Sequence, residues 1–266
     1  MAKGPAVSEA VLNFPTDVSE GQASRDHQRA YRALRQRVAA TKAPAFWPAF
    51  PPKPALSVLE RAGLIRLVGA IPGLCSEPKM HALIEIMRHA PSGDIVDLGT
   101  GWGRSAALLA RLSERYDLGH VLCIDSWMNE SGGGGDSLVD PDEALRMFQI
   151  NLAPLAGGRL NYIRAQPRDA ASLYRPDLAV SSETFGDTHY QGAIAVLHLA
   201  GEAAADPQKW LPRMARGGWI VLDGYEGCDG AQSVADALVG PHGGDVSTAF
   251  QVGGALFIQL RCPHHD

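Results

Sequence analysis

Short runs of apolar residues alternate with amphipathic stretches through most of the chain, and this alternation predicts repeated strand and helix units. The apolar runs predict seven strands, at 94–98, 120–125, 160–164, 194–199, 217–222, 246–251 and 255–260. The amphipathic stretches predict helices at 57–71, 77–89, 104–115, 142–152, 204–215 and 230–239. Gly253-Gly254 joins the last two strands as a hairpin, so one strand should be antiparallel. The expected fold class is α/β, a doubly wound, mostly parallel seven-stranded sheet with helices on both faces.

The N-terminal part of the chain has a different pattern. Residues 1–22 carry few large apolar side chains, and 24–40 read as a helix with an arginine stripe. A proline-rich passage follows at 43–54, which excludes helix and sheet and predicts a connector whose aromatic side chains pin it to the domain surface. We therefore expect residues 1–56 to form an arm, a helix and a connector, and 57–266 to form the main domain. The arginine stripe makes a homodimer a further expectation.

A glycine-rich turn follows the strand at 94–98. Its pattern is Asp-x-Gly-x-Gly-x-Gly over residues 97–103, and glycine there allows both a sharp turn and the close approach of a ligand. A dinucleotide fingerprint would require glycine at position 104, where this chain has Arg104, so NAD is disfavoured. The next strand ends in Asp125, at the position where an acid accepts hydrogen bonds from ribose hydroxyls.

The turn resembles the first motif of class I S-adenosylmethionine-dependent methyltransferases. In that motif the acid, here Asp97, serves the amino-acid part of the cofactor. A narrower resemblance runs from Ile71 through the turn, then over 194–225 and 255–257, to the bacterial group of macrocin-type O-methyltransferases, methyltransferase family 24. The cofactor-binding residues that these resemblances and the strand-end positions predict are Asp97, Gly99, Thr100, Gly101, Gly103, Ser105, Asp125, Ser126, Trp127 and Gln166. For Trp127, packing against adjoining helices is an equal alternative.

Members of that group bind magnesium through acids that follow the fourth and fifth strands. This chain departs from the pattern, because Ala200 replaces the first acid and Asp223-Gly224 replaces a pair of acids. Glu202 and Asp223 could still form a weak magnesium site. The loss of two acids instead predicts an enzyme that needs no metal.

Without a metal, another group must assist removal of the proton from the acceptor. The candidates for this catalytic role are His198 within an apolar strand, His189 before that strand, and Asp223 at the end of the next one. A histidine such as His198 is also often a satisfied core residue. The resulting hypothesis is methylation of a hydroxyl group of a small molecule. Two alternatives stay open: methylation of nitrogen, sulfur or a carboxylate in a natural product or peptide, and a non-catalytic protein that only binds the cofactor.

Composition narrows the possible partners. The net charge of −5 and the pI near 6.0 give no electrostatic reason to expect nucleic acid or an anionic membrane. Without a long apolar run or the apolar core of a signal peptide, the chain is expected to be cytoplasmic. The glycine run at 132–135 predicts either a lid over a ligand or an insertion without a role.

Overall fold

The computed structural model describes residues 20–44, 46, 49–128, 140–200, 207–224 and 246–261. The glycine run at 132–135, the predicted helix at 230–239 and Glu202 lie outside the described residues. The chain divides into two compact units, residues 1–41 and 42–266. In the first unit, α1 (Glu20–Ala40) is the predicted arginine-striped helix. No helix within the described ranges is long and apolar enough to cross a membrane.

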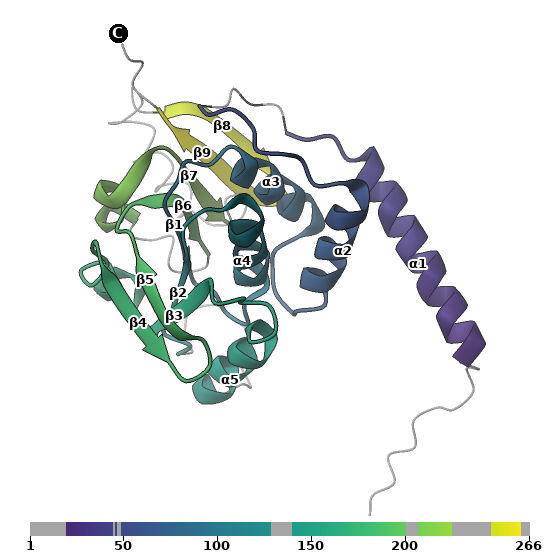
Figure 1. Cartoon of the computed structure of the whole chain (residues 1–266), viewed down its shortest axis with the longest axis horizontal. Coiled ribbons are helices and arrows are strands. Elements are labelled where there is room, and N and C mark those ends of the chain that lie inside the picture. The colour runs from purple at the N-terminus through teal and green to yellow at the C-terminus, as the bar shows by residue number, and fades with distance from the viewer. Residues whose placement is uncertain are drawn as a thin grey trace, which may run out of the picture. The chain divides into compact units, whose positions relative to one another are not determined.

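The second unit is built on a seven-stranded sheet of order β3-β2-β1-β6-β7-β9-β8 (Figure 1). Its strands are β1 (Asp94–Leu98), β2 (Val121–Asp125), β3 (Leu160–Arg164), β6 (Ile194–Leu199), β7 (Met214–Asp223), β8 (Val246–Val252) and β9 (Ala255–Leu260). The five strands from β3 to β7 in this order are parallel, and β9 runs antiparallel to both β7 and β8. The predicted sheet and its terminal hairpin are therefore confirmed.

Helices cover the face of the sheet on which Asp97 lies. They are α2 (Val58–Gly69), α3 (Glu77–Arg88), α4 (Arg104–Tyr116) and α5 (Pro141–Leu152), and all four were expected from the sequence. Helix α4 packs on β1 and β2, and α2 and α3 pack on α4. Ser57 and Ser76 cap α2 and α3 through their side-chain oxygens, which fixes where these helices begin.

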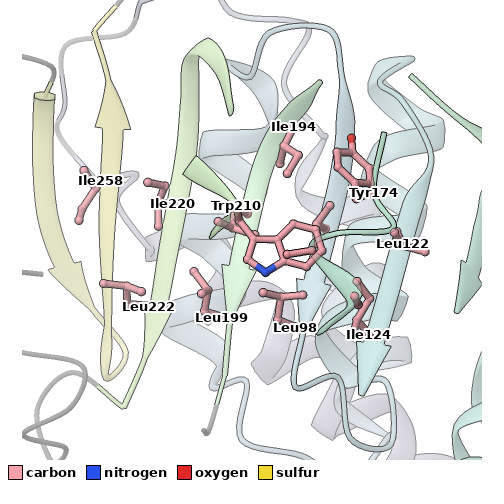
Figure 2. Close-up of a cluster of buried hydrophobic side chains, with 14 of the residues drawn as sticks. Leu98, Leu122, Ile124, Tyr174, Ile194, Leu199, Trp210, Ile220, Leu222 and Ile258 are labelled. Atoms are coloured by element: carbon pink, nitrogen blue, oxygen red, sulfur yellow. The ribbon is translucent and has the colours of Figure 1, made fainter. Parts of the chain in front are cut away.

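The opposite face of the sheet carries a continuous hydrophobic core (Figure 2). Leu98, Leu122 and Leu222 project from the strands into this core. Tyr174 and Trp210 cover it, with ring centroids 5.8 Å apart. Because side chains alternate between the two faces of a strand, burying Val96 and Leu98 here turns Asp97 toward the helices.

Two features differ from the sequence expectation. The described part of the predicted helix at 204–215 forms two 3₁₀ turns, η2 (Pro207–Lys209) and η3 (Leu211–Arg213), after which β7 begins at Met214. Pro207 and Pro212 explain the correction, because each lacks the N–H that a helix interior needs. The short helix α6 (Pro167–Ala170) and the two-stranded sheet of β4 (Leu178–Ser182) and β5 (Gly186–Tyr190) were not predicted.

The proline-rich connector is held by aromatic contacts, as predicted. The ring of Phe46 lies 5.0 Å from that of Trp219 and 5.2 Å from that of His89, centroid to centroid. Phe50 packs at Gly217, where any Cβ would collide with its ring. The connector therefore belongs with the sheet on which it packs.

Candidate active site

The three positions of the turn require glycine for different structural reasons. Gly99, Gly101 and Gly103 have φ values of +74°, +54° and +92°, a region that L side chains rarely adopt. A Cβ on Gly99 would collide with the carbonyl oxygen of Ala200, and one on Gly103 would collide with Leu152. A Cβ on Gly101 would meet nothing within 4 Å. Gly99 and Gly103 thus permit close packing, whereas Gly101 borders open space that a ligand can enter.

Asp125 stands beside this open space, at the carboxyl end of β2. Its Oδ2 accepts the N–H of Gly101 at 2.8 Å, and its Oδ1 accepts the N–H of Trp127 at 2.7 Å. Burial raises the pKa of Asp125, and the N–H groups of Gly101 and Trp127 lower it by less, so the pKa lies above its ordinary value. Asp125 therefore lies next to the backbone of Gly101, and its contact with the ribose stays a prediction.

Trp127 was expected to contact the cofactor, and in the structure it packs against neighbouring aromatic side chains. It is 5% exposed, and its ring centroid lies 5.1 Å from that of Phe148 and 5.7 Å from that of Tyr162. Its indole N–H donates to the carbonyl oxygen of Gly101 at 2.8 Å. Packing against a helix, the alternative left open by the sequence, is thus present, and Trp127 supports the turn from the side.

Ser126 and Gln166 follow β2 and β3 at the carboxyl edge of the sheet. The hydroxyl of Ser126 accepts the N–H of Met128 at 3.2 Å, and Gln166 is the N-cap residue of α6. Both lie where the open parallel sheet places its ligands. Their contacts with the cofactor stay predictions.

Asp97 lies beneath the turn and has no exposed surface. Its Oδ2 accepts the hydroxyls of Thr100 at 2.6 Å and Ser105 at 3.0 Å. Its Oδ1 lies 2.5 Å from Nδ1 of His198. Asp97, Thr100 and Ser105 therefore hold the turn, the start of α4 and β6 together; a direct contact of these residues with the cofactor stays a prediction.

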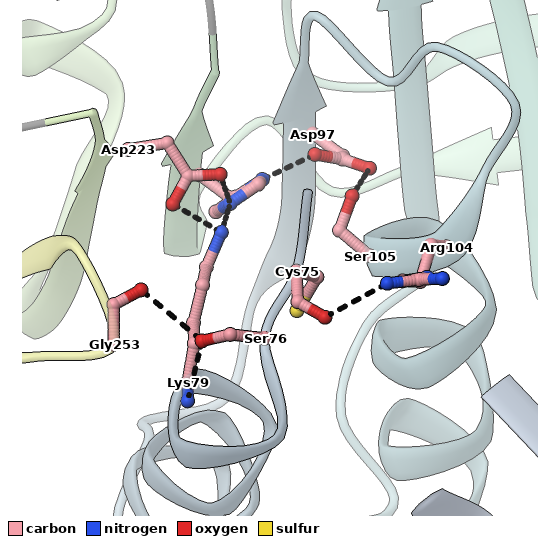
Figure 3. Close-up of polar contacts among 9 residues, drawn as sticks. Cys75, Ser76, Lys79, Asp97, Arg104, Ser105, Asp223 and Gly253 are labelled. Atoms are coloured by element: carbon pink, nitrogen blue, oxygen red, sulfur yellow. Dashed lines mark hydrogen bonds and ion pairs between the residues drawn. The ribbon is translucent and has the colours of Figure 1, made fainter. Parts of the chain in front are cut away.

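Arg104 directly follows the turn and is the first residue of α4. Its guanidinium donates to the carbonyl oxygen of Cys75 (Figure 3). It also donates to the carbonyl oxygen of Ile71, and both acceptors lie in the loop between α2 and α3. The residue that breaks the dinucleotide pattern thus fastens that loop to the glycine turn.

A buried lysine joins His198 and Asp223, and it was not expected from the sequence. Lys79 of α3 extends to the ends of β6 and β7, where its Nζ forms an ion pair with Oδ1 of Asp223 (Figure 3). The same Nζ lies 2.6 Å from Nε2 of His198, which in turn lies 3.3 Å from Oδ2 of Asp223. The side chains of Lys79 and His198 are each 1% exposed, whereas that of Asp223 is 17% exposed. Asp223 is therefore the member of this group that an acceptor can touch.

The charges of these side chains are strongly coupled. Burial raises the pKa of Asp223, but His198 and Lys79 lower it by more, so the pKa falls to about 2. Burial and Lys79 lower the pKa of His198, but Asp97 and Asp223 outweigh them and the pKa is raised. Two N–H groups cannot point at each other across 2.6 Å, so one hydrogen lies between Nζ and Nε2. Lys79 and His198 thus lie side by side between the carboxylates of Asp97 and Asp223.

His189 does not join this group. It lies on β5, and its carbonyl oxygen accepts a hydrogen bond from Nδ1 of His120 at 2.7 Å. His120 precedes β2, so His189 is at the amino edge of the sheet, whereas His198 and Asp223 are at the carboxyl edge. This geometry contradicts the expectation that His189 acts as a base at the site.

The residues present do not fit the magnesium site of the resembling group. Ala200 and Gly224 offer no side-chain oxygen, and the carboxylate of Asp223 is engaged by Lys79 and His198. Within the described ranges, no three His, Cys, Asp or Glu side chains are placed to hold a metal ion. Glu202, the other candidate ligand, lies in the part of the chain that is not described.

Comparison with known families agrees with this fold. Residues 96–225 match the family 24 model, which is described as a methyltransferase domain. The match spans the glycine turn, Asp125, His198 and Asp223, which lie on or directly after the parallel strands β1, β2, β6 and β7. Residues 96–225 therefore carry a methyltransferase domain, and the chain is an S-adenosylmethionine-dependent methyltransferase.

Solved structures resemble the chain at low sequence identity. The O-methyltransferase NovP has 16% identity and a TM-score of 0.48, with 90% of this chain and 100% of NovP covered. The calicheamicin methyltransferase CalS11 has 12% identity and a TM-score of 0.47, with 97% and 98% covered. Cofactor-bound Rv0187 from MTB has 18% identity and a TM-score of 0.44, with 89% and 90% covered. No curated protein sequence matches the chain.

Proposed function

We propose that the protein transfers a methyl group from S-adenosylmethionine to a hydroxyl group of a small molecule, without a divalent metal. The main support for cofactor binding is the open space at Gly101, beside the carboxylate of Asp125. Asp125 would accept the ribose hydroxyls, and the backbone at Gly101 would lie against the cofactor. Bound there, the cofactor supplies an electrophilic methyl group on a positively charged sulfur.

The acceptor part of the proposal centres on Asp223. During transfer the acceptor oxygen forms a bond to the methyl carbon, the bond from sulfur to that carbon breaks, and the electron pair stays on sulfur. The hydroxyl proton leaves the acceptor for a base or for water. Because its pKa is about 2, Asp223 is anionic at neutral pH and accepts a hydrogen bond from the hydroxyl, but it is a weak base. Its main contribution is to orient the acceptor oxygen toward the methyl group.

His198 then serves as a positioning residue. It has no exposed surface, so it reaches an acceptor only through Asp223. Its ring joins Asp223 to Asp97, and thereby joins the acceptor position to the cofactor turn.

The weak basicity of Asp223 also favours a second candidate function. An amine, a thiolate or a carboxylate is nucleophilic without help from a strong base, so methylation of nitrogen, sulfur or a carboxyl group suits this site as well. A panel of acceptors separates the two candidate functions. If the protein methylates hydroxyl groups, only the hydroxyl compounds yield S-adenosylhomocysteine. If it methylates nitrogen, sulfur or a carboxyl group, only those nucleophiles do.

The experiment for the proposed function measures formation of S-adenosylhomocysteine with this panel, in buffer containing a chelator. Transfer to a hydroxyl compound at an undiminished rate in the chelator supports the proposal. Transfer that requires added magnesium contradicts the metal-independent part. Cofactor binding without transfer to any acceptor favours the non-catalytic alternative.

A further inference from the structure

Lys79 is an unusual residue for a protein interior, because lysine is rarely fully buried. Its side chain is 1% exposed, and a buried ammonium group is costly unless charged partners compensate for the lost water. Its partners are the carboxylate of Asp223 and Nε2 of His198. The fold therefore keeps a lysine where an apolar side chain would avoid the desolvation cost.

The local structure fixes the start of α3 next to β7. Ser76 caps α3 by accepting the N–H of Lys79 at 3.4 Å, and its hydroxyl donates to the carbonyl oxygen of Gly253 at 3.2 Å (Figure 3). Gly253 has φ +63°, and a Cβ there would lie 2.6 Å from Oγ of Ser76 and 2.7 Å from N of Lys79. The hairpin of β8 and β9 is thus shaped to receive the first turn of α3.

This contact between the hairpin and the start of α3 determines where the ammonium group of Lys79 lies. Asp223 pairs with Ala255, the first residue of β9 after the hairpin turn, so Gly253 is close to Asp223 along the sheet. The backbone of Lys79 and the carboxylate of Asp223 are therefore held from the same hairpin. A flexible surface lysine would have no such support.

We propose that Lys79 is the built-in cation of the acceptor site: its Nζ occupies the side of the Asp223 carboxylate at which a divalent cation would otherwise bind, and positions that carboxylate for the acceptor. This proposal rests on the proposed function for its acceptor. Lys79 acts through Asp223 and is a positioning residue. His198 completes the arrangement because its ring contacts Nζ of Lys79 and links Asp223 to Asp97.

The test is a titration of the full chain with Mn²⁺ in the presence of S-adenosylhomocysteine. Electron paramagnetic resonance measures how much Mn²⁺ is bound. The variants are Lys79→Ala, Asp223→Asn and the double variant Lys79→Ala/Asp223→Asn. Lys53→Ala is the matched control, because Nζ of Lys53 is also partly buried and donates to the carbonyl oxygen of Ala90 at 2.8 Å, away from Asp223. Thermal unfolding of every variant establishes that it is folded before the titration.

We expect no Mn²⁺ site that depends on Asp223 in the wild-type protein or in Lys53→Ala. Lys79→Ala should gain Mn²⁺ binding, and the double variant should lose it again. Wild-type protein that binds Mn²⁺ and loses it in Asp223→Asn would overturn the proposal, as would a folded Lys79→Ala variant without a gain. These outcomes are independent of methyl transfer, so a failure to find an acceptor challenges the proposed function alone.

Discussion

Asp97 and His198 are register partners on the adjacent parallel strands β1 and β6, and Nδ1 of His198 lies 2.5 Å from Oδ1 of Asp97. The other oxygen of Asp97 accepts the hydroxyls of Thr100 in the glycine turn and Ser105 in α4. The other nitrogen of His198 faces Lys79 and Asp223. The cofactor turn and the acceptor position are thus joined through one buried pair of side chains. Neither residue can be removed without leaving charged or polar groups unpaired.

The first prediction concerns this pair. Asp97→Asn removes the buried negative charge opposite His198 and should lower the free energy of unfolding by about 3 kcal/mol, as expected when one partner of a buried charged pair is lost. Ser105→Ala, which removes only one hydroxyl donor to Asp97, should cost about 1 kcal/mol. Chemical denaturation measures both, and an Asp97→Asn variant as stable as wild type would contradict the pairing.

The second prediction concerns Gly101. Gly101→Ala should lower the affinity for S-adenosylhomocysteine at least about tenfold, because the new Cβ enters the space that the cofactor fills. Gly158→Ala is the control, since Gly158 has φ +73° and also meets nothing within 4 Å, but it precedes β3 at the amino edge. Both changes should cost about 1–2 kcal/mol of stability from the left-handed backbone. Equal affinities in the two variants would place the cofactor elsewhere.

The third prediction is a pH dependence of cofactor binding. In the proposed function Asp125 accepts ribose hydroxyls as a carboxylate, and burial raises its pKa. Affinity should therefore be full above this raised pKa and should fall as the pH drops through it, at a higher pH than an ordinary aspartate would give. Titrations of S-adenosylhomocysteine at a series of pH values measure this. Asp125→Asn should bind more weakly and show no such dependence, and a parallel decline in both proteins would assign the effect to another group.

The fourth prediction concerns stability in acid. The pKa of Asp223 is lowered to about 2, below its ordinary value of 3.8, so its ion pair stabilises the folded state above about pH 4 and is lost as the pH falls toward 2. The contribution is about 2 kcal/mol, since one pKa unit corresponds to about 1.4 kcal/mol. In Lys79→Met the free energy of unfolding should fall less between about pH 4 and pH 2 than in the wild type. In Lys79→Arg it should fall as much as in the wild type. Unfolding followed between pH 2 and 5 compares the three proteins, and identical curves would show that Lys79 does not stabilise the Asp223 anion.

Much of the fold followed from local sequence patterns. The strands β1, β2 and β6 are short apolar runs next to turn or helix signals, so their existence and their positions along the chain could be predicted. Asp97 and Asp125 could be singled out because each ends such a run. The β4 and β5 hairpin escaped prediction because its strands are short and carry many polar residues, and only its three-dimensional setting buries Thr188 and Tyr190.

The acceptor side of the site was less predictable. Lys79 lies four and seven residues before the buried Leu83 and Ile86, so a lysine on the apolar stripe of α3 was the available signal. Nothing local shows that its Nζ meets Asp223, which is 144 positions further along the chain (223 − 79). His189 was misplaced because the unexpected hairpin carries it to the other edge of the sheet. The homodimer expected from the arginine-striped helix stays a prediction, which sedimentation can test.

The most direct measurement is a calorimetric titration of the full chain with S-adenosylmethionine, performed once with magnesium and once with a chelator. We expect binding with a Kd in the micromolar range that is equal in the two buffers and is lost in Asp125→Ala. The absence of binding in both buffers would contradict the cofactor site at Gly101 and Asp125. Binding only with magnesium would contradict the assignment of Lys79 as the cation of the site.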